Sequence, residues 1–185
     1  MSFLVVSKNE NQDLSRPFLP MGAGVLPVAF RGGRAYFLFS RERKGTKNKD
    51  SGKWSDFGGK TERGESYRDT AIREAHEESM GLMGTTEDIA ELIDECLVGT
   101  VDVGFYRTYI VEVQYDSSIP EIFRDVFTKA PKGLVDSCNG LYEKDDAMWL
   151  RSDKIKHFRN EFTSWYRRSG IPWRAAGIVS GYTPS

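Results

Sequence analysis

The chain has 185 residues, of which 39% are hydrophobic, and both values are typical of one globular domain with a sizeable core. Its 26 basic and 27 acidic side chains give a net charge of −1, which argues against a dedicated nucleic-acid or membrane-surface binder. No stretch approaches the roughly 20 apolar residues of a membrane span. The only cysteines, Cys96 and Cys138, lie far apart outside any CxxC motif. We therefore expect a cytoplasmic protein without membrane association.

The first part of the chain predicts an extension followed by a hairpin. Residues 1–20 are expected to be an N-terminal extension, because two prolines separate them from the periodic part. Residues 23–30 and 35–41 have strand composition and flank the glycine-rich turn signal at 31–34. Pro27 cannot donate a ladder hydrogen bond, so we predict an edge or bulged position for the first strand.

The segment 41–53 is polar and mostly basic. Most short charge runs only solvate a surface, and that is one interpretation here. Arg41, however, stands at the end of a predicted strand, where its guanidinium could meet a phosphate. We therefore name Arg41 as a candidate substrate-binding residue.

A loop and a helix follow. Residues 53–57 form a short extended piece, and Gly58-Gly59 allows a tight turn or a close approach to a ligand. A helix is predicted to begin at Glu65 or Ser66 and to end at Gly81.

The rest of the chain alternates strands and helices. The predicted elements are a short helix from Thr85 to about Ile93, a hairpin of 96–103 and 105–114, a helix over 117–129, a strand at 147–150 and an amphipathic helix over 153–168. Gly, Pro and Ser after residue 168 predict a C-terminal tail of low order over 169–185. The domain itself is thus expected to cover 21–168, with an α+β fold in which helices flank a mixed central sheet.

Three glutamates project from one face of the helix that follows Gly58-Gly59. Glu74, Glu77 and Glu78 stand at positions i, i+3 and i+4. Like charges at this spacing repel one another, whereas hard divalent cations such as Mg²⁺ prefer carboxylate oxygens and often share a site with phosphates. The pattern predicts a metal site, although a solvated glutamate-rich face is the alternative. Glu143, from the acidic cluster before the last strand, is our candidate for a further ligand.

The same stretch resembles the Nudix box. That pattern is Gly, five residues, Glu, seven residues and then Arg-Glu-U-x-Glu-Glu-x-Gly-U, where U is a bulky aliphatic residue. The residues that match are Gly59, Glu65, Arg73, Glu74, Glu77 and Glu78, with Ala75 as a small version of U. The chain departs from the pattern at Ser79-Met80, which places Gly81 and Leu82 one position late. We predict that the extra residue at Met80 lengthens the helix by one residue and leaves the carboxylates in register.

The resemblance implies an α/β/α sandwich that hydrolyses a nucleoside diphosphate linked to another group X. It implies Mg²⁺, or Mn²⁺ in its place, as cofactor. By resemblance, Glu77 and Glu78 are metal ligands, Glu74 is both a ligand and the candidate base, and the Gly59 carbonyl is a further ligand.

The resemblance also implies two supporting roles. Glu65 and Arg73 are expected to pair and hold the loop against the helix. Arg41 stands where members of the family often carry an arginine on the substrate phosphates.

Two other functions stay open. An mRNA-decapping type of enzyme would use the basic segments 41–53 and 154–168 for contacts with the RNA backbone, although the neutral overall charge speaks against it. A noncatalytic nucleotide-binding module is disfavoured by the intact carboxylates. The partner we expect is a small nucleotide substrate. The oligomeric state stays open, with room for a homodimer at the edge predicted for Pro27.

Overall fold

The computed structural model describes residues 21–136 and 140–184. The predicted N-terminal extension at 1–20 and Cys138 lie outside the described residues. Cys96 is a free, exposed thiol. Within the described part of the chain, no helix has both the length and the apolar composition needed to cross a membrane.

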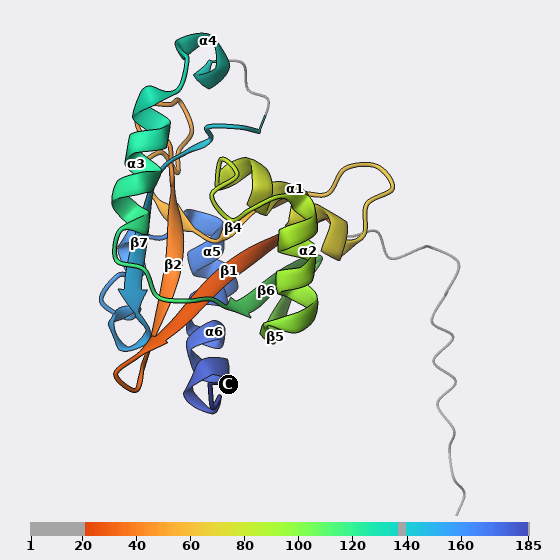
Figure 1. Cartoon of the computed structure of the whole chain (residues 1–185), viewed down its shortest axis with the longest axis vertical. Coiled ribbons are helices and arrows are strands. Elements are labelled where there is room, and N and C mark those ends of the chain that lie inside the picture. Colours follow the sequence, from red (N-terminus) through yellow and green to blue (C-terminus); the bar gives the residue numbers. More distant parts are fainter. Residues whose placement is uncertain (1–20, 137–139, 185) are drawn as a thin grey trace, which may run out of the picture.

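A seven-stranded mixed sheet forms the centre of the molecule (Figure 1). Its strands are β1 (Gly22–Arg31), β2 (Arg34–Glu42), β3 (Trp54–Ser55), β4 (Phe57–Lys60), β5 (Leu97–Val103), β6 (Tyr106–Glu112) and β7 (Lys144–Arg151). The path is β3-β2-β1-β6-β5, while β4 pairs with β1 and β7 pairs with β2. Only β1 and β6 run parallel among these pairs. Both predicted hairpins are present, and Gly32 and Gly33 turn the first one with positive φ angles of 57° and 69°.

The position of Pro27 corrects our prediction of an edge strand. β1 is central, because it pairs with β6 along one side and with β4 and then β2 along the other. The β4 ladder ends at Val25 and the β2 ladder begins at Val28. Pro27 therefore lies in the gap between two partners, where its missing N–H costs no ladder bond. The edge on which we based the option of a homodimer is not at β1.

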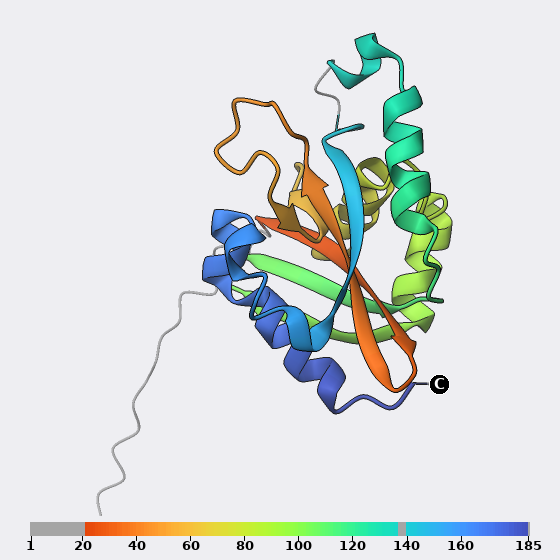
Figure 2. The same cartoon turned by 90° about the vertical axis from the view of Figure 1, so that its left-hand side faces the viewer.

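Helices cover both faces of the sheet (Figure 2). They are α1 (Tyr67–Glu78), α2 (Thr86–Glu95), α3 (Ile119–Lys129), α4 (Lys132–Val135), α5 (Ser164–Ser169) and α6 (Ile171–Ser180). One core cluster joins α1, α2 and α3 to one sheet face, and a second joins α5 and α6 to the other. The prediction of an α+β sandwich with a mixed central sheet is thereby confirmed.

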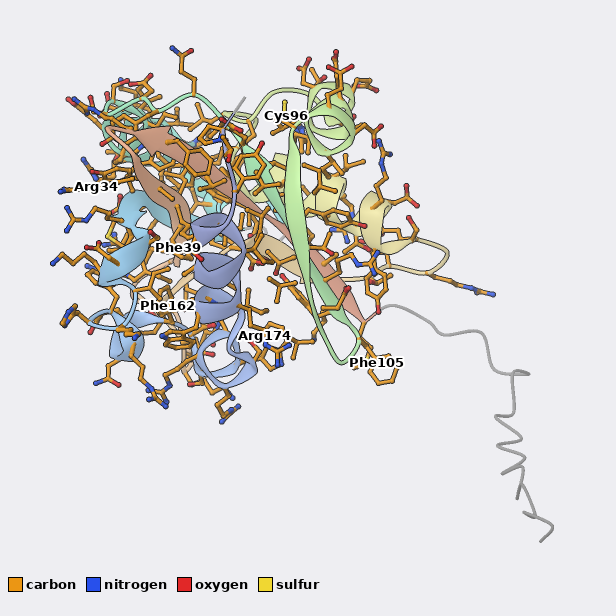
Figure 3. All side chains as sticks on the ribbon, turned by 90° about the horizontal axis from the view of Figure 1, so that it is seen from below. Arg34, Phe39, Cys96, Phe105, Phe162 and Arg174 are labelled. Carbon is orange, nitrogen blue, oxygen red and sulfur yellow. The ribbon has the colours of Figure 1, made fainter. Side chains whose placement is uncertain are left out.

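The C-terminal third differs from our predictions. Residues 153–168 do not form one helix, because the chain extends at Phe162 and Thr163 and the Thr163 amide donates to the Trp54 carbonyl at 2.9 Å. Two 3₁₀ turns (Ser152–Lys154 and Arg159–Glu161) and α5 replace it. Figure 3 shows Phe162 close to Phe39, and their ring centroids are 5.0 Å apart.

The predicted tail of low order is also wrong over residues 171–180. These residues form α6, which buries Ile171, Ala175 and Val179 against the sheet. Pro172 lies in the first turn of this helix. A proline there costs no hydrogen bond, so its presence after residue 168 is compatible with a helix.

Candidate active site

Helix α1 begins with a capping box. Ser66 accepts a hydrogen bond from the Asp69 amide, and the Asp69 carboxylate accepts one from the Ser66 amide. The buried Ala71, Ile72 and Ala75 anchor the helix to the sheet. The predicted start at Glu65 or Ser66 is therefore confirmed, and the packed face fixes the direction in which the glutamates of α1 point.

The end of α1 corrects our prediction about the extra residue. The helix ends at Glu78 and is not lengthened. Met80 takes a left-handed conformation with φ 55°, its amide donates to the Glu77 carbonyl at 3.0 Å, and the Gly81 amide donates to the His76 carbonyl at 3.0 Å. These two bonds are those of a Schellman turn, with a methionine where glycine is usual. The insertion is thus absorbed after the carboxylates, which keep their helical register.

Two of the three glutamates, Glu74 and Glu78, lie against the Gly58-Gly59 segment of β4. A Cβ added to Gly59 would lie 2.6 Å from the carboxyl carbon of Glu74. Glu78 is 4% exposed and accepts a 2.7 Å hydrogen bond from the Gly58 amide. Glu77 is the most exposed of the three and faces the loop before β7, where a Cβ on Gly140 would lie 3.0 Å from its carboxyl carbon.

The predicted contact between Glu65 and Arg73 is present. The Arg73 guanidinium donates to both Glu65 oxygens at 2.7 and 3.0 Å and to the Lys60 carbonyl at 2.9 Å. Arg73 lowers the pKa of Glu65 to about 2. The same guanidinium reaches Glu74 at 2.9 Å and Glu77 at 3.3 Å, so Arg73 ties the loop to two of the clustered carboxylates.

The backbone of β4 directs the carbonyl groups of Gly58 and Gly59 to opposite sides. The Gly59 carbonyl oxygen lies beside β1, 2.5 Å from where a Cβ on Gly22 would stand. The Gly58 amide points the other way, to Glu78. In a strand, the amide and carbonyl of one residue point to the same side. The Gly58 carbonyl, not that of Gly59, therefore faces the carboxylates.

Lys144 and Glu42 belong to the site, although sequence reasoning did not find them. Lys144 is 1% exposed, and its ammonium group contacts Glu42, Glu78 at 3.2 Å and Ser55 Oγ at 3.1 Å. Burial alone would lower the pKa of Lys144, but the two carboxylates raise it. Because Glu42 and Lys144 meet only through the pairing of β2 with β7, no local pattern marks them.

Glu143 precedes Lys144 and faces the same cluster. It is exposed, yet its pKa is raised, first by partial loss of water around the carboxylate and then by repulsion from Glu42 and Glu77. Its neighbour Tyr142 has a positive φ of 65°. Such strain in a non-glycine residue is often found beside functional side chains.

The position of Arg41 does not support the predicted phosphate contact. Its guanidinium donates to Asp145 at 2.7 Å, pairs with Asp146 at 3.1 Å and lies over the Trp54 ring at 5.4 Å. With these partners Arg41 joins the end of β2 to the start of β7. Of the basic residues nearby, Lys60 and Arg168 instead line a cavity that adjoins Gly58 and Gly59.

The donor set fits a hard divalent cation. Burial raises the pKa of Glu78 well above its ordinary value, and Glu42 and Glu74 add to this by repulsion. Burial also raises the pKa of Glu74, with a further contribution from Glu77 and Glu143. Within residues 21–136 and 140–184, no three acidic, His or Cys side chains already converge as a metal-binding group. Arg73 contacts Glu74, and Lys144 contacts Glu78. A hard divalent cation, which prefers oxygen ligands, would offset the remaining repulsion between these carboxylates.

Asp56 makes a separate contribution to the pH dependence of the free energy of unfolding. Burial raises its pKa from 3.8 to about 6, although Thr108 and other partners oppose the shift. Because the folded state then binds the proton more tightly than the unfolded state, this group's contribution to stability falls as pH rises from about 4 to about 6. Asp56→Asn should not show this loss. As pH rises across this range, its free energy of unfolding should therefore increase by about 2–3 kcal/mol relative to that of wild type.

Urea unfolding of both proteins from pH 4.5 to 7.5 measures this difference. Asp116→Asn is a useful comparison, because hydrogen bonds from Ser118 lower the pKa of Asp116 and the pH dependence it contributes has the opposite sign. Parallel pH profiles for wild type and Asp56→Asn would contradict the assignment to Asp56.

Comparison with known proteins agrees with this architecture. A model of the NUDIX domain matches residues 19–168. The chain is 37% identical over 90 residues to "Uncharacterized protein L534" of Acanthamoeba polyphaga mimivirus, a match that covers 46% of this chain and 29% of that protein. The chain thus spans less than a third of that relative's length.

Two solved structures share the fold. The Nudix hydrolase RenU from M. Smegmatis is 17% identical, with a TM-score of 0.51 over 87% of this chain and 86% of that chain. A C. elegans Ap4A hydrolase in a binary complex is 13% identical, with a TM-score of 0.50 over 89% of this chain and 100% of that chain. The family match covers most of the chain, so the chain belongs to the Nudix family.

Proposed function

We propose that the protein hydrolyses a nucleoside diphosphate linked to a second group X in a reaction that depends on Mg²⁺. The observation that carries this proposal is that Glu74 and Glu78 lie against the Gly58-Gly59 segment, which itself lines a cavity of about 730 Å³, with Glu77 beside them on α1. Carboxylates beside a cavity are suited to hold a cation together with a phosphorylated substrate.

The proposed ligands are Glu74, Glu77, Glu78 and Glu143 together with the Gly58 carbonyl. When bound, Mg²⁺ would supply charge stabilisation for the phosphoryl group and a more acidic water as nucleophile. Glu74 remains our candidate base, because burial raises its pKa toward the range in which a carboxylate accepts a proton efficiently near neutral pH.

The cations of the chain keep these carboxylates in place. Arg73 contacts Glu74 and Glu77, and Lys144 contacts Glu78. Because each of these three glutamates is held by a partner that is itself buried or paired, its carboxylate oxygens are oriented before a cation binds. Lys60 and Arg168, which line the cavity, are the basic groups placed to meet substrate phosphates.

Glu77→Gln is the sharpest test of the proposed activity. Among the described residues Glu77 forms an ion pair only with Arg73, so its loss should not unfold the protein. We expect hydrolysis to fall about tenfold or more, since one charged metal ligand is neutralised. Phosphate or nucleotide release is measured with Mg²⁺ on nucleoside triphosphates, nucleotide sugars, dinucleoside polyphosphates and capped RNA.

Glu91→Gln is the matched control, because Glu91 is exposed on α2. A thermal melt with and without MgCl₂ adds a readout that is independent of turnover, and Mg²⁺ should raise the Tm of wild type more than that of Glu77→Gln. Wild type that hydrolyses none of these substrates, or Glu77→Gln with full activity, would refute the proposal.

A further inference from the structure

A cavity of about 730 Å³ opens between β4, the turn that joins β5 to β6, and α5. Glu42, Gly58 and Gly59 line one side of it, so this side of the cavity adjoins the segment that Glu74 and Glu78 contact. Asp56 and Tyr166 line it on the side of the buried core. A substrate that places its diphosphate at the carboxylates can therefore place an attached group here.

Buried polar side chains form the inner end of the cavity. Asp56 is 1% exposed and accepts hydrogen bonds from the Thr108 hydroxyl at 2.7 Å and the Tyr106 hydroxyl at 3.2 Å. One such bond per oxygen leaves acceptor capacity on the carboxylate. A buried carboxylate loses its hydration, which is unfavourable unless hydrogen-bond donors replace the water. A ligand could supply the missing donors.

The hydroxyl of Tyr166 indicates that a polar ligand binds at this end of the cavity. Tyr166 is 1% exposed, and within the described residues its hydroxyl has no hydrogen-bond partner. Burial first, and then the nearby Asp56 carboxylate, raise the pKa of Tyr166, so the hydroxyl keeps its proton and can donate. Leaving such a group without a partner destabilises the folded state, and folded proteins rarely tolerate this outside functional sites.

Aromatic rings form the outer part of the cavity. Trp165 is 42% exposed and meets the Tyr106 ring edge-on, with 4.7 Å between ring centroids. Phe105 is 45% exposed at the turn between β5 and β6, where Figure 3 shows it projecting from the body of the molecule. Exposed rings at a cavity mouth offer the flat apolar surface on which a nucleobase stacks.

We propose that this cavity binds the base of the substrate, and that Asp56 and Tyr166 read its hydrogen-bonding edge and favour guanine. This inference rests on the proposed function. Guanine presents two adjacent N–H donors, which suit the two oxygens of Asp56, and a carbonyl that can accept from the Tyr166 hydroxyl. Trp165 supplies the stacking surface. Adenine, cytosine and uracil lack the pair of adjacent donors.

Binding of nucleoside monophosphates in EDTA tests the proposal without turnover. GMP is expected to bind about tenfold more tightly than AMP, CMP or UMP in titration calorimetry. Tyr166→Phe should weaken GMP binding about fivefold while its Tm stays at or above the wild-type value, because among the described residues the hydroxyl has no partner to lose. Asp56→Asn should remove the preference for GMP, and Trp165→Ala should weaken all four ligands.

Tyr182→Phe is the matched control, since the Tyr182 hydroxyl donates to Glu112 and lies outside the cavity. It should leave GMP binding unchanged. Equal binding of the four monophosphates, binding of none, or a Tyr166→Phe protein with wild-type affinity and selectivity would overturn the proposal. Preferential GMP binding by a wild type that hydrolyses nothing would refute the proposed function alone, whereas hydrolysis without base preference would refute only the base assignment.

Discussion

Lys144→Met is expected to lower the free energy of unfolding by about 3–5 kcal/mol, because it removes one partner of a buried ion pair and strands the other. Lys144 is 1% exposed and Glu78 is 4% exposed, so neither charge can turn to solvent. Methionine keeps the length and apolar body of the side chain. The loss is therefore one of charge compensation, with little contribution from packing volume.

The cost should depend on pH. Burial already raises the pKa of Glu78 well above its ordinary value, with Lys144 as the main opposing influence. Without Lys144, Glu78 will bind a proton more readily, so the variant should recover part of its stability as pH falls. Urea unfolding at several pH values measures both the size of the loss and its direction with pH.

Two further variants isolate the mechanism. Lys129→Met is the control, because Lys129 pairs with Asp125 on the surface and its side chain is 76% exposed, so its loss should change stability by less than about 1 kcal/mol. Lys144→Met combined with Glu78→Gln should recover part of the loss, since the stranded charge is then removed. A Lys144→Met protein as stable as the Lys129→Met protein would contradict the role of Lys144 as the buried counter-charge.

Lys144 also shows which part of the site the sequence could not predict. The carboxylates of α1 and the contact of Arg73 with Glu65 follow from spacing along one loop and one helix, so they can be predicted locally. Glu42 and Lys144 lie about a hundred positions apart in the chain and meet through the pairing of β2 with β7. A lysine beside acidic residues in the sequence resembles an ordinary solvated surface, and only the tertiary structure shows that it is buried.

The errors in the C-terminal third have the same origin. Ile155 and Phe162, two residues of the apolar face of the predicted helix, are both buried, yet the backbone between them forms turns and a short 3₁₀ segment and not one α-helix. A hydrogen bond from Thr163 to the Trp54 carbonyl, which no local pattern signals, extends the chain there. The sequence thus predicts which side chains enter the core more securely than the backbone that carries them.

Gly58 and Gly59 are adjacent in the chain, but we expect their replacement by alanine to give opposite results. Neither has a positive φ angle, so backbone strain is not the issue. A Cβ on Gly59 would meet the carboxylate of Glu74, which is the far end of a flexible side chain. Gly59→Ala should therefore fold normally and lose about a hundredfold in kcat/KM, because displacement of a catalytic group by about 1 Å can have that effect.

A Cβ on Gly58 would instead lie 2.5 Å from the Gly24 Cα and 2.6 Å from the Ala23 carbonyl oxygen, which are backbone atoms of β1. Because β1 is the central strand and cannot move aside, Gly58→Ala should lose about 1–3 kcal/mol of unfolding free energy. Urea unfolding and kcat/KM measured side by side separate the two cases, and Gly133→Ala, which adds a methyl group into open space, is the control. Full activity in Gly59→Ala would show that Glu74 need not lie where the structure places it.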